Sequence, residues 1–220
     1  MLASIVMKKH FHALKARLAG LTLIEVLVGV AILGVILAVA APSMADLLEK
    51  RRVIAAAEEV AGLLNYAKAE TNATNSQLLV KFAPPASSMS CALVATTGPA
   101  NNCRCWNPVN EVCPGAQRPL RLFQLPLTHV KFEASATSWG GPGATANAVR
   151  FARDQMTIAV ENFSVEVVGT GKGYTLRVEV NAAGRVKVCA PAVGKHGATK
   201  FSEMSGYGEC SPIPAPAPAP

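Results

Sequence analysis

The feature that most constrains this chain is an apolar run of 24 residues from Leu21 to Met44, in which Glu25 is the only charged residue. As an α-helix this run would span about 36 Å, at about 1.5 Å per residue. The hydrocarbon core of a bilayer is about 30 Å thick, so the helix can cross it with some tilt. The sequence therefore predicts a transmembrane helix over 21–44 and a water-exposed part after it.

The positive charge of the chain is unevenly distributed. The net charge of the chain is +7. Four cations and no acid precede Gly20, namely Lys8, Lys9, Lys15 and Arg17, so the residues after Gly20 carry a net charge of +3. Basic residues before an apolar helix favour a cytoplasmic N-terminus, with the remainder on the other side of the membrane. The later part is only mildly basic, so the overall charge gives little support for nucleic-acid binding.

Glu25 is difficult to explain in a simple membrane anchor. A cleaved secretory signal ending at Ala38–Ala41 is one alternative, but the apolar region of such a signal usually spans about 7–15 residues and this run is longer. A plain signal anchor is another, but it explains Glu25 poorly, because an ionised carboxylate in hydrocarbon costs on the order of 3 kcal/mol. Cleavage between Gly20 and Leu21 would create a cationic amine on Leu21. In an assembly, this amine could neutralise Glu25 of a neighbouring subunit, which would make Glu25 a device that sets the register between subunits.

These residues resemble the class III signal of type IV pilins and type II secretion pseudopilins. The matching positions are Gly20, Thr22, Leu23, Glu25 and Pro42, and the departure is Leu21, where phenylalanine is usual. The resemblance implies that a prepilin peptidase removes the basic leader 1–20 and methylates the amine of Leu21. It also implies other pilins as partners, assembly through Glu25 and Pro42, and a bacterial inner-membrane location before export into a fibre.

The residues after Pro42 predict an α+β domain. Pro42 should kink or loosen the helix, which resumes as an amphipathic half over 45–75 with an apolar stripe: Val53, Ala56, Ala57, Val60, Leu63, Leu64 and Ala67. A globular β domain is expected over 76–211, followed by an extended Pro/Ala tail over 212–220. Strands are predicted at 77–82, 90–95, 120–125, 130–134, 149–151, 156–160, 163–168, 174–180 and 185–189. The resemblance implies a pilin-like fold, with a long N-terminal helix, half of it transmembrane, packed on an antiparallel β domain. The many short strands independently indicate an α+β domain with two small sheets.

The last two predicted strands form a hairpin whose register can be derived. Tyr174–Val180 alternates, and Val186 and Val188 continue its apolar face only if Val180 pairs with Val186. This pairing requires a loop with an odd number of residues, in which Gly184 adopts a left-handed bulge. The other face then carries Arg177, Glu179 and Lys187, with Arg185 at the tip.

Gly184-Arg-Val-Lys187 also resembles the C-terminal G-R-x-R stretch of FimT-type minor pilins in the FimT/GspH family, whose members are implicated in DNA capture during natural transformation. Lys187 replaces the second arginine, and it binds phosphate as a point charge without the bidentate fork. The predicted contacts to duplex DNA are Arg185, Lys187, Lys195, Lys200 and Arg177. The alternative is a solvated hairpin whose cations protect a sheet edge from aggregation.

All six cysteines lie beyond residue 90, which predicts disulfides in an exported domain. Cys189 and Cys210 are the preferred pair, because they leave Cys91, Cys103, Cys105 and Cys113 as a local group with open connectivity. A zinc site at Cys103, Cys105 and Cys113 is the alternative, but the spacing of these cysteines is not that of a zinc finger.

No catalytic or cofactor-binding site is predicted. Gly169–Gly173 lacks the complete phosphate-loop pattern and reads as a turn, and the four histidines support no Ser/His/Asp arrangement, which leaves a tethered enzyme as a minor alternative. The resemblance implies a type IV pilus minor pilin that binds duplex DNA, or else a type II secretion pseudopilin or a priming subunit without DNA binding.

Overall fold

The computed structural model describes residues 20–84, 87–98, 102–136, 147–152, 162–181, 183–192, 204 and 206–211. The chain divides into two compact units, Met1–Ser43 and Met44–Pro220. The predicted strand over 156–160, the first 19 residues of the predicted leader 1–20 and the tail over 212–220 lie outside the described residues.

Helix α1 runs from Leu23 to Thr74 and contains Pro42. Asn75, which follows the helix, has a φ of 53°. A single left-handed residue at this position is a common way for a helix to end, and asparagine tolerates it better than most side chains. The predicted stripe is confirmed, because all seven of its residues are buried.

Among the described residues, eight strands form two antiparallel sheets of four, which confirms the predicted fold class. The first sheet has the order β3-β2-β1-β5 and the second the order β4-β6-β7-β8. Their bounds are β1 Leu78–Phe82, β2 Met89–Thr96, β3 Pro119–Pro126, β4 Val130–Ala136, β5 Ala148–Phe151, β6 Asn162–Gly169, β7 Thr175–Asn181 and β8 Val186–Cys189. A short 3-10 helix, η1, covers Val109–Glu111.

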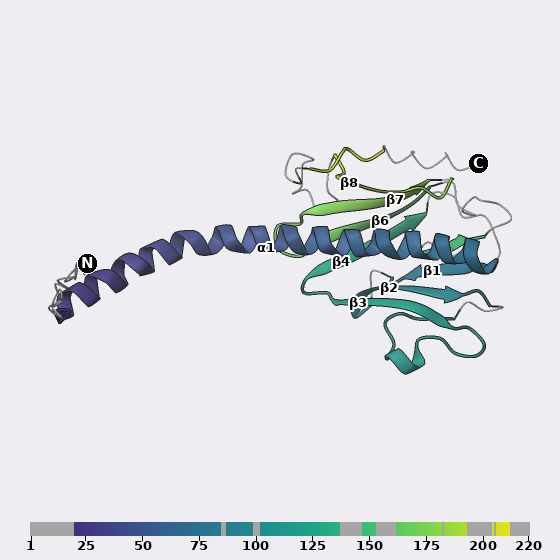
Figure 1. Ribbon diagram of the computed structural model, residues 1–220, viewed down its shortest axis with the longest axis horizontal. Coiled ribbons are helices and arrows are strands. Elements are labelled where there is room, and N and C mark those ends of the chain that lie inside the picture. The colour runs from purple at the N-terminus through teal and green to yellow at the C-terminus, as the bar shows by residue number, and fades with distance from the viewer. Residues whose placement is uncertain are drawn as a thin grey trace, which may run out of the picture. The chain divides into compact units, whose positions relative to one another are not determined.

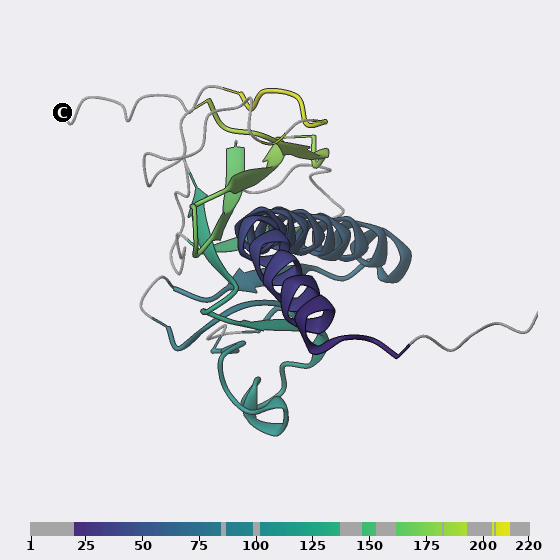
Figure 2. The same cartoon turned by 90° about the vertical axis from the view of Figure 1, so that its left-hand side faces the viewer.

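The second half of α1 shares one hydrophobic core with both sheets. Leu64 of the helix belongs to the same cluster as Val80 of the first sheet and Leu176 of the second. Viewed along the helix, strands of the two sheets lie on its two sides (Figure 2). The rings of Phe82 and Phe163 lie 5.7 Å apart and join the sheets within this core.

Strand β2 is buried on both faces. Ala92 and Val94 face the core shared with α1, whereas Cys91 and Leu93 face a second, smaller cluster. This smaller cluster is closed by two disulfides, Cys91–Cys105 and Cys103–Cys113, which settle the connectivity that the sequence left open.

Candidate functional site

The start of α1 is built by Thr22 and Glu25. The backbone N–H and the hydroxyl of Thr22 both donate to Oε2 of Glu25, each at 2.9 Å, and the N–H of Glu25 donates to the Thr22 hydroxyl at 3.3 Å. This reciprocal pair is a capping box, which satisfies backbone donors that a helix leaves without intrahelical partners. The T-x-x-E spacing is the sequence signal for this cap, and it gives Glu25 a role in helix capping besides its predicted role in assembly.

The predicted processing point lies directly before this cap. Gly20 and Leu21 are exposed and precede the first helical residue, Leu23. The bond between them is therefore in non-helical backbone. Pro42, the other predicted assembly residue, lies inside α1, which is helical on both sides of it.

Within the part of the chain that the structure describes, the apolar part of α1 is exposed. Among the described residues, α1 is the one helix long and apolar enough to cross a membrane, judged by length and composition alone. None of its most apolar 18-residue window is buried. An exposed apolar surface of this extent marks a site of association with lipid or with other protein surfaces.

The β7–β8 hairpin has the register that the sequence predicts. Val178 pairs with Val188, Glu179 with Lys187, and Val180 with Val186. Gly184 has a φ of 68°, a conformation that glycine adopts at little cost. The N–H of Gly184 donates to the carbonyl of Asn181 at 2.8 Å, and the N–H of Arg185 donates to its side-chain oxygen at 2.9 Å.

Helix α1 holds the tip of this hairpin through Lys68. The Lys68 ammonium donates to the carbonyl of Gly184 at 3.0 Å and to that of Ala183 at 3.3 Å. The turn that presents Arg185 is thus fixed to the helix. Sequence reasoning missed this contact, because Lys68 lies more than a hundred residues earlier in the chain.

Of the five cations predicted to contact DNA, the described residues place two on the exposed hairpin. Arg185 and Lys187 are both exposed, and the Lys187 ammonium donates to the carbonyl of Glu209 at 2.9 Å. Lys195 and Lys200 lie outside the described residues. Lys172, a further cation near β7, lies at the other end of that strand, roughly 20 Å from Arg185 at about 3.3 Å per residue.

Arg177 does not belong to the exposed set, contrary to the prediction. Its side chain is only 7% exposed, and it donates to Oε1 of Glu166 at 2.7 and 3.1 Å. It also lies 3.5 Å from Glu179 and contacts the carbonyl of Ser211. The sequence placed Arg177 correctly on the face opposite the core, but the segment 206–211 covers it.

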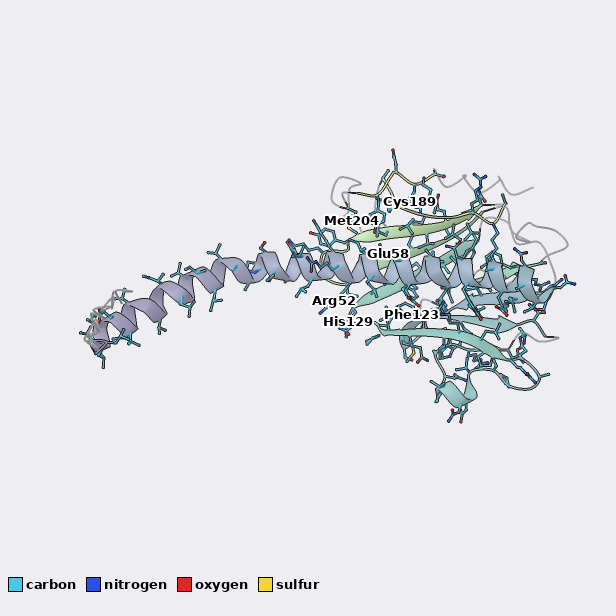
Figure 3. The ribbon with its side chains drawn as sticks, in the orientation of Figure 1. Arg52, Glu58, Phe123, His129, Cys189 and Met204 are labelled. Carbon is cyan, nitrogen blue, oxygen red and sulfur yellow. A yellow bond between two sulfur atoms is a disulfide. The ribbon has the colours of Figure 1, made fainter. Side chains whose placement is uncertain are left out.

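The disulfide Cys189–Cys210 ties this segment to β8, and it is the pairing that the sequence favours. The backbone N–H of Ala190 donates to the carbonyl of Gly208 at 2.9 Å, and the N–H of Cys210 donates to the carbonyl of Ala190 at 3.0 Å. Figure 3 shows Cys189 and Met204 on the same side of α1 as β7 and β8, and His129 and Phe123 on the other. The two sulfurs lie near Glu179, but each is bonded to the other, so neither is a thiolate that could ligate a metal.

A family model described as Type II transport protein GspH matches residues 56–184 of this chain. The chain belongs to this family. A second model, the prokaryotic N-terminal methylation motif, matches residues 15–41, which include the capped helix start and Pro42. The predicted membership of the pilins and pseudopilins is therefore confirmed.

Among solved structures, the type IV minor pilin FimU of Pseudomonas aeruginosa (strain PAO1) is 14% identical, with a TM-score of 0.39 over 61% of this chain and 90% of that chain. Comparison with curated proteins finds no match. As a GspH-family protein, the chain is a minor pilin or pseudopilin of a type IV pilus or a type II secretion system. The family consists of structural subunits that assemble with other pilins, and the apolar helix with its methylation motif is suited to membrane anchoring.

Proposed function

We propose that this GspH-family protein is a minor pilin of a type IV pilus, which assembles through α1 and binds extracellular duplex DNA through the β7–β8 hairpin. The observation that carries the assembly part is the uncovered apolar half of α1. In the membrane this surface contacts lipid, and in a fibre it packs among the helices of other pilins. The domain after Met44 faces the periplasm and later the exterior.

Processing by a prepilin peptidase after Gly20 prepares the subunit for assembly. The exposed, non-helical Gly20–Leu21 bond is accessible to a protease. The methylated amine of Leu21 then pairs with Glu25 of a neighbouring subunit. Within one chain, Thr22 uses Oε2 of Glu25, and no contact to Oε1 is present among the described residues.

Glu25→Gln is expected to lower incorporation into fibres by on the order of tenfold or more, because it removes the charge that pairs with the amine. Glutamine can still accept the hydrogen bonds of Thr22, so the helix cap is retained. The measurement is the amount of subunit in sheared fibres relative to the amount in the membrane. Glu59→Gln is the matched control on the same helix, and equal incorporation of both variants would contradict the role of Glu25.

Support for DNA binding comes from Arg185 and Lys187, which are exposed on a turn held in place by Lys68. Phosphate contacts of this kind are sequence-independent and weaken with salt. No aromatic side chains line the described hairpin, which favours contact to the duplex backbone over stacking on single strands.

The experiment is duplex DNA binding by a fragment from Met44 to Pro220, titrated by fluorescence anisotropy at two salt concentrations. This fragment contains one compact unit and keeps the disulfides. The double variant Arg185→Gln, Lys187→Gln is expected to weaken binding at least tenfold and to reduce the salt slope by roughly 2. The control is the double variant Arg104→Gln, Arg118→Gln, which removes the same amount of charge from two exposed positions outside the hairpin.

Binding that falls equally in both double variants would contradict a site on the hairpin. The second candidate function is a type II secretion pseudopilin, or a priming subunit, with no role in DNA binding. The burial of Arg177 favours it, because it removes one cation from the predicted interface. If the fragment binds no duplex DNA even at low salt, the DNA-binding proposal fails and the pseudopilin or priming subunit without DNA binding remains.

A further inference from the structure

The connection between β6 and β7 binds a carboxylate of α1. Oε1 of Glu49 accepts hydrogen bonds from the N–H groups of Gly171 and Lys172, both at 3.0 Å, and of Gly173 at 3.3 Å. Oε2 accepts a further bond from Lys172 at 2.9 Å. Successive backbone N–H groups that converge on one anion form a nest, the arrangement used by many phosphate-binding loops.

The glycines of this loop make room for the carboxylate. A Cβ atom on Gly169 would lie 2.3 Å from Oε1 of Glu49, and one on Gly171 would lie 2.5 Å from Oε2. Gly173 has a φ of 75°, which other residues adopt with strain. The glycine-rich stretch of the sequence is therefore a receptor for a group in the same chain.

A second contact lies one helical turn before the first. The Lys172 ammonium donates to Oδ2 of Asp46, and this contact raises the pKa of Lys172 above its ordinary value. Lys50 lies 4.7 Å from the ring centre of Tyr174, just after the loop. Three side chains within the first two turns after Met44 thus engage the same connection, which Figure 1 shows beside α1.

We propose that Asp46 and Glu49 are positioning residues for assembly, which fasten the first turns of α1 beyond the apolar segment to the second sheet. The inference rests on the proposed assembly function. Pro42 lies inside α1 and removes one helical hydrogen bond, so the turns that follow it depend more on contacts outside the helix. We call the loop 169–173 the helix clamp. It binds Asp46 and Glu49, so the helix from Asp46 onward moves together with the domain when the apolar half is pulled.

The buried stripe of α1 does not by itself explain this attachment. The stripe begins at Val53, whereas Asp46 and Glu49 precede it by one to two turns. Leu47 and Leu48, between them, are exposed at 45% and 49%. Over these residues the polar clamp replaces hydrophobic packing as the contact with the domain.

The test is amide hydrogen exchange of the full-length protein in non-ionic detergent, followed by mass spectrometry. Glu49→Gln and Gly171→Ala are each expected to accelerate exchange over residues 45–52 by on the order of tenfold, because each removes charge-assisted hydrogen bonds. Gly171 lacks a positive φ, and the nearest atoms to its added Cβ belong to Glu49, so alanine displaces the carboxylate without straining the backbone. The double variant should exchange no faster than either single variant.

Glu59→Gln and Gly208→Ala are the matched controls, since a Cβ on Gly208 meets nothing within 4 Å. Unchanged exchange over 45–52 in both test variants would overturn the helix clamp. So would equal acceleration along the whole helix to Ala67, which would report lost global stability. Because the readout does not involve fibres, these outcomes are separate from a failure of Glu25→Gln to alter assembly.

Discussion

Replacing Arg177 with methionine is expected to lower the free energy of unfolding by about 3–5 kcal/mol, the usual cost of removing one partner of a buried ion pair. The change leaves the Glu166 carboxylate, only 6% exposed, without its cation. Oε2 of Glu166 already lacks a hydrogen-bond partner among the described residues, so the carboxylate has little to compensate the loss. Urea unfolding followed by circular dichroism, with the disulfides intact, measures the change.

Two further variants make this expectation specific. Arg185→Met, at an exposed position on the same hairpin, should alter the free energy of unfolding by less than about 0.5 kcal/mol. Combining Arg177→Met with Glu166→Met removes both charges and should recover much of the lost stability. A single-variant loss below about 1 kcal/mol would mean that Arg177 is not buried in solution, and it would return Arg177 to the set of candidate DNA contacts.

Replacing Cys189 and Cys210 together with alanine is expected to cost about 3 kcal/mol of stability. The disulfide joins residues 21 apart, and closing a loop of that length restricts the unfolded chain by about this amount. The bond also keeps Ser211 on Arg177 and Glu209 on Lys187. Its loss should therefore loosen the cover of the ion pair as well as the edge of the sheet.

The same urea titration measures this change, and hydrogen exchange over 206–211 reports the local part of it. Exchange of this segment should rise in the alanine variant under conditions where the core strands remain protected. A stability loss below about 1 kcal/mol together with unchanged exchange would show that the segment stays in place without the disulfide.

The sequence predicted those features that depend on near neighbours. The apolar stripe of α1 follows from helical spacing, and the pairing of Val180 with Val186 follows from alternation and a single glycine. Both rest on contacts between residues close together in the chain or on one repeating pattern. The same holds for the turn after β6, which was expected to be a turn and is one.

Contacts between distant segments could not be predicted. Alternation placed Arg177 on the outer face, but it gave no sign that residues 206–211 cover that face. The glycine loop was identified as a turn, yet its ligand, Glu49, lies 122 residues before Gly171. Neither composition nor periodicity reveals such a pairing, because a glutamate on a helix and a glycine in a turn are each common without any partner elsewhere in the chain.

The shared core also sets the order in which the domain can fold during synthesis. Leu63 and Leu64 of α1 leave the ribosome early, but their cluster includes Val178 and Met204, which are synthesised more than a hundred residues later. Contacts that close such long loops form slowly, and the apolar surfaces that await them are prone to wrong associations. The stripe of α1 thus stays uncovered until nearly the entire chain is available, which makes completion of the chain, rather than local helix formation, the step that gates folding of the domain.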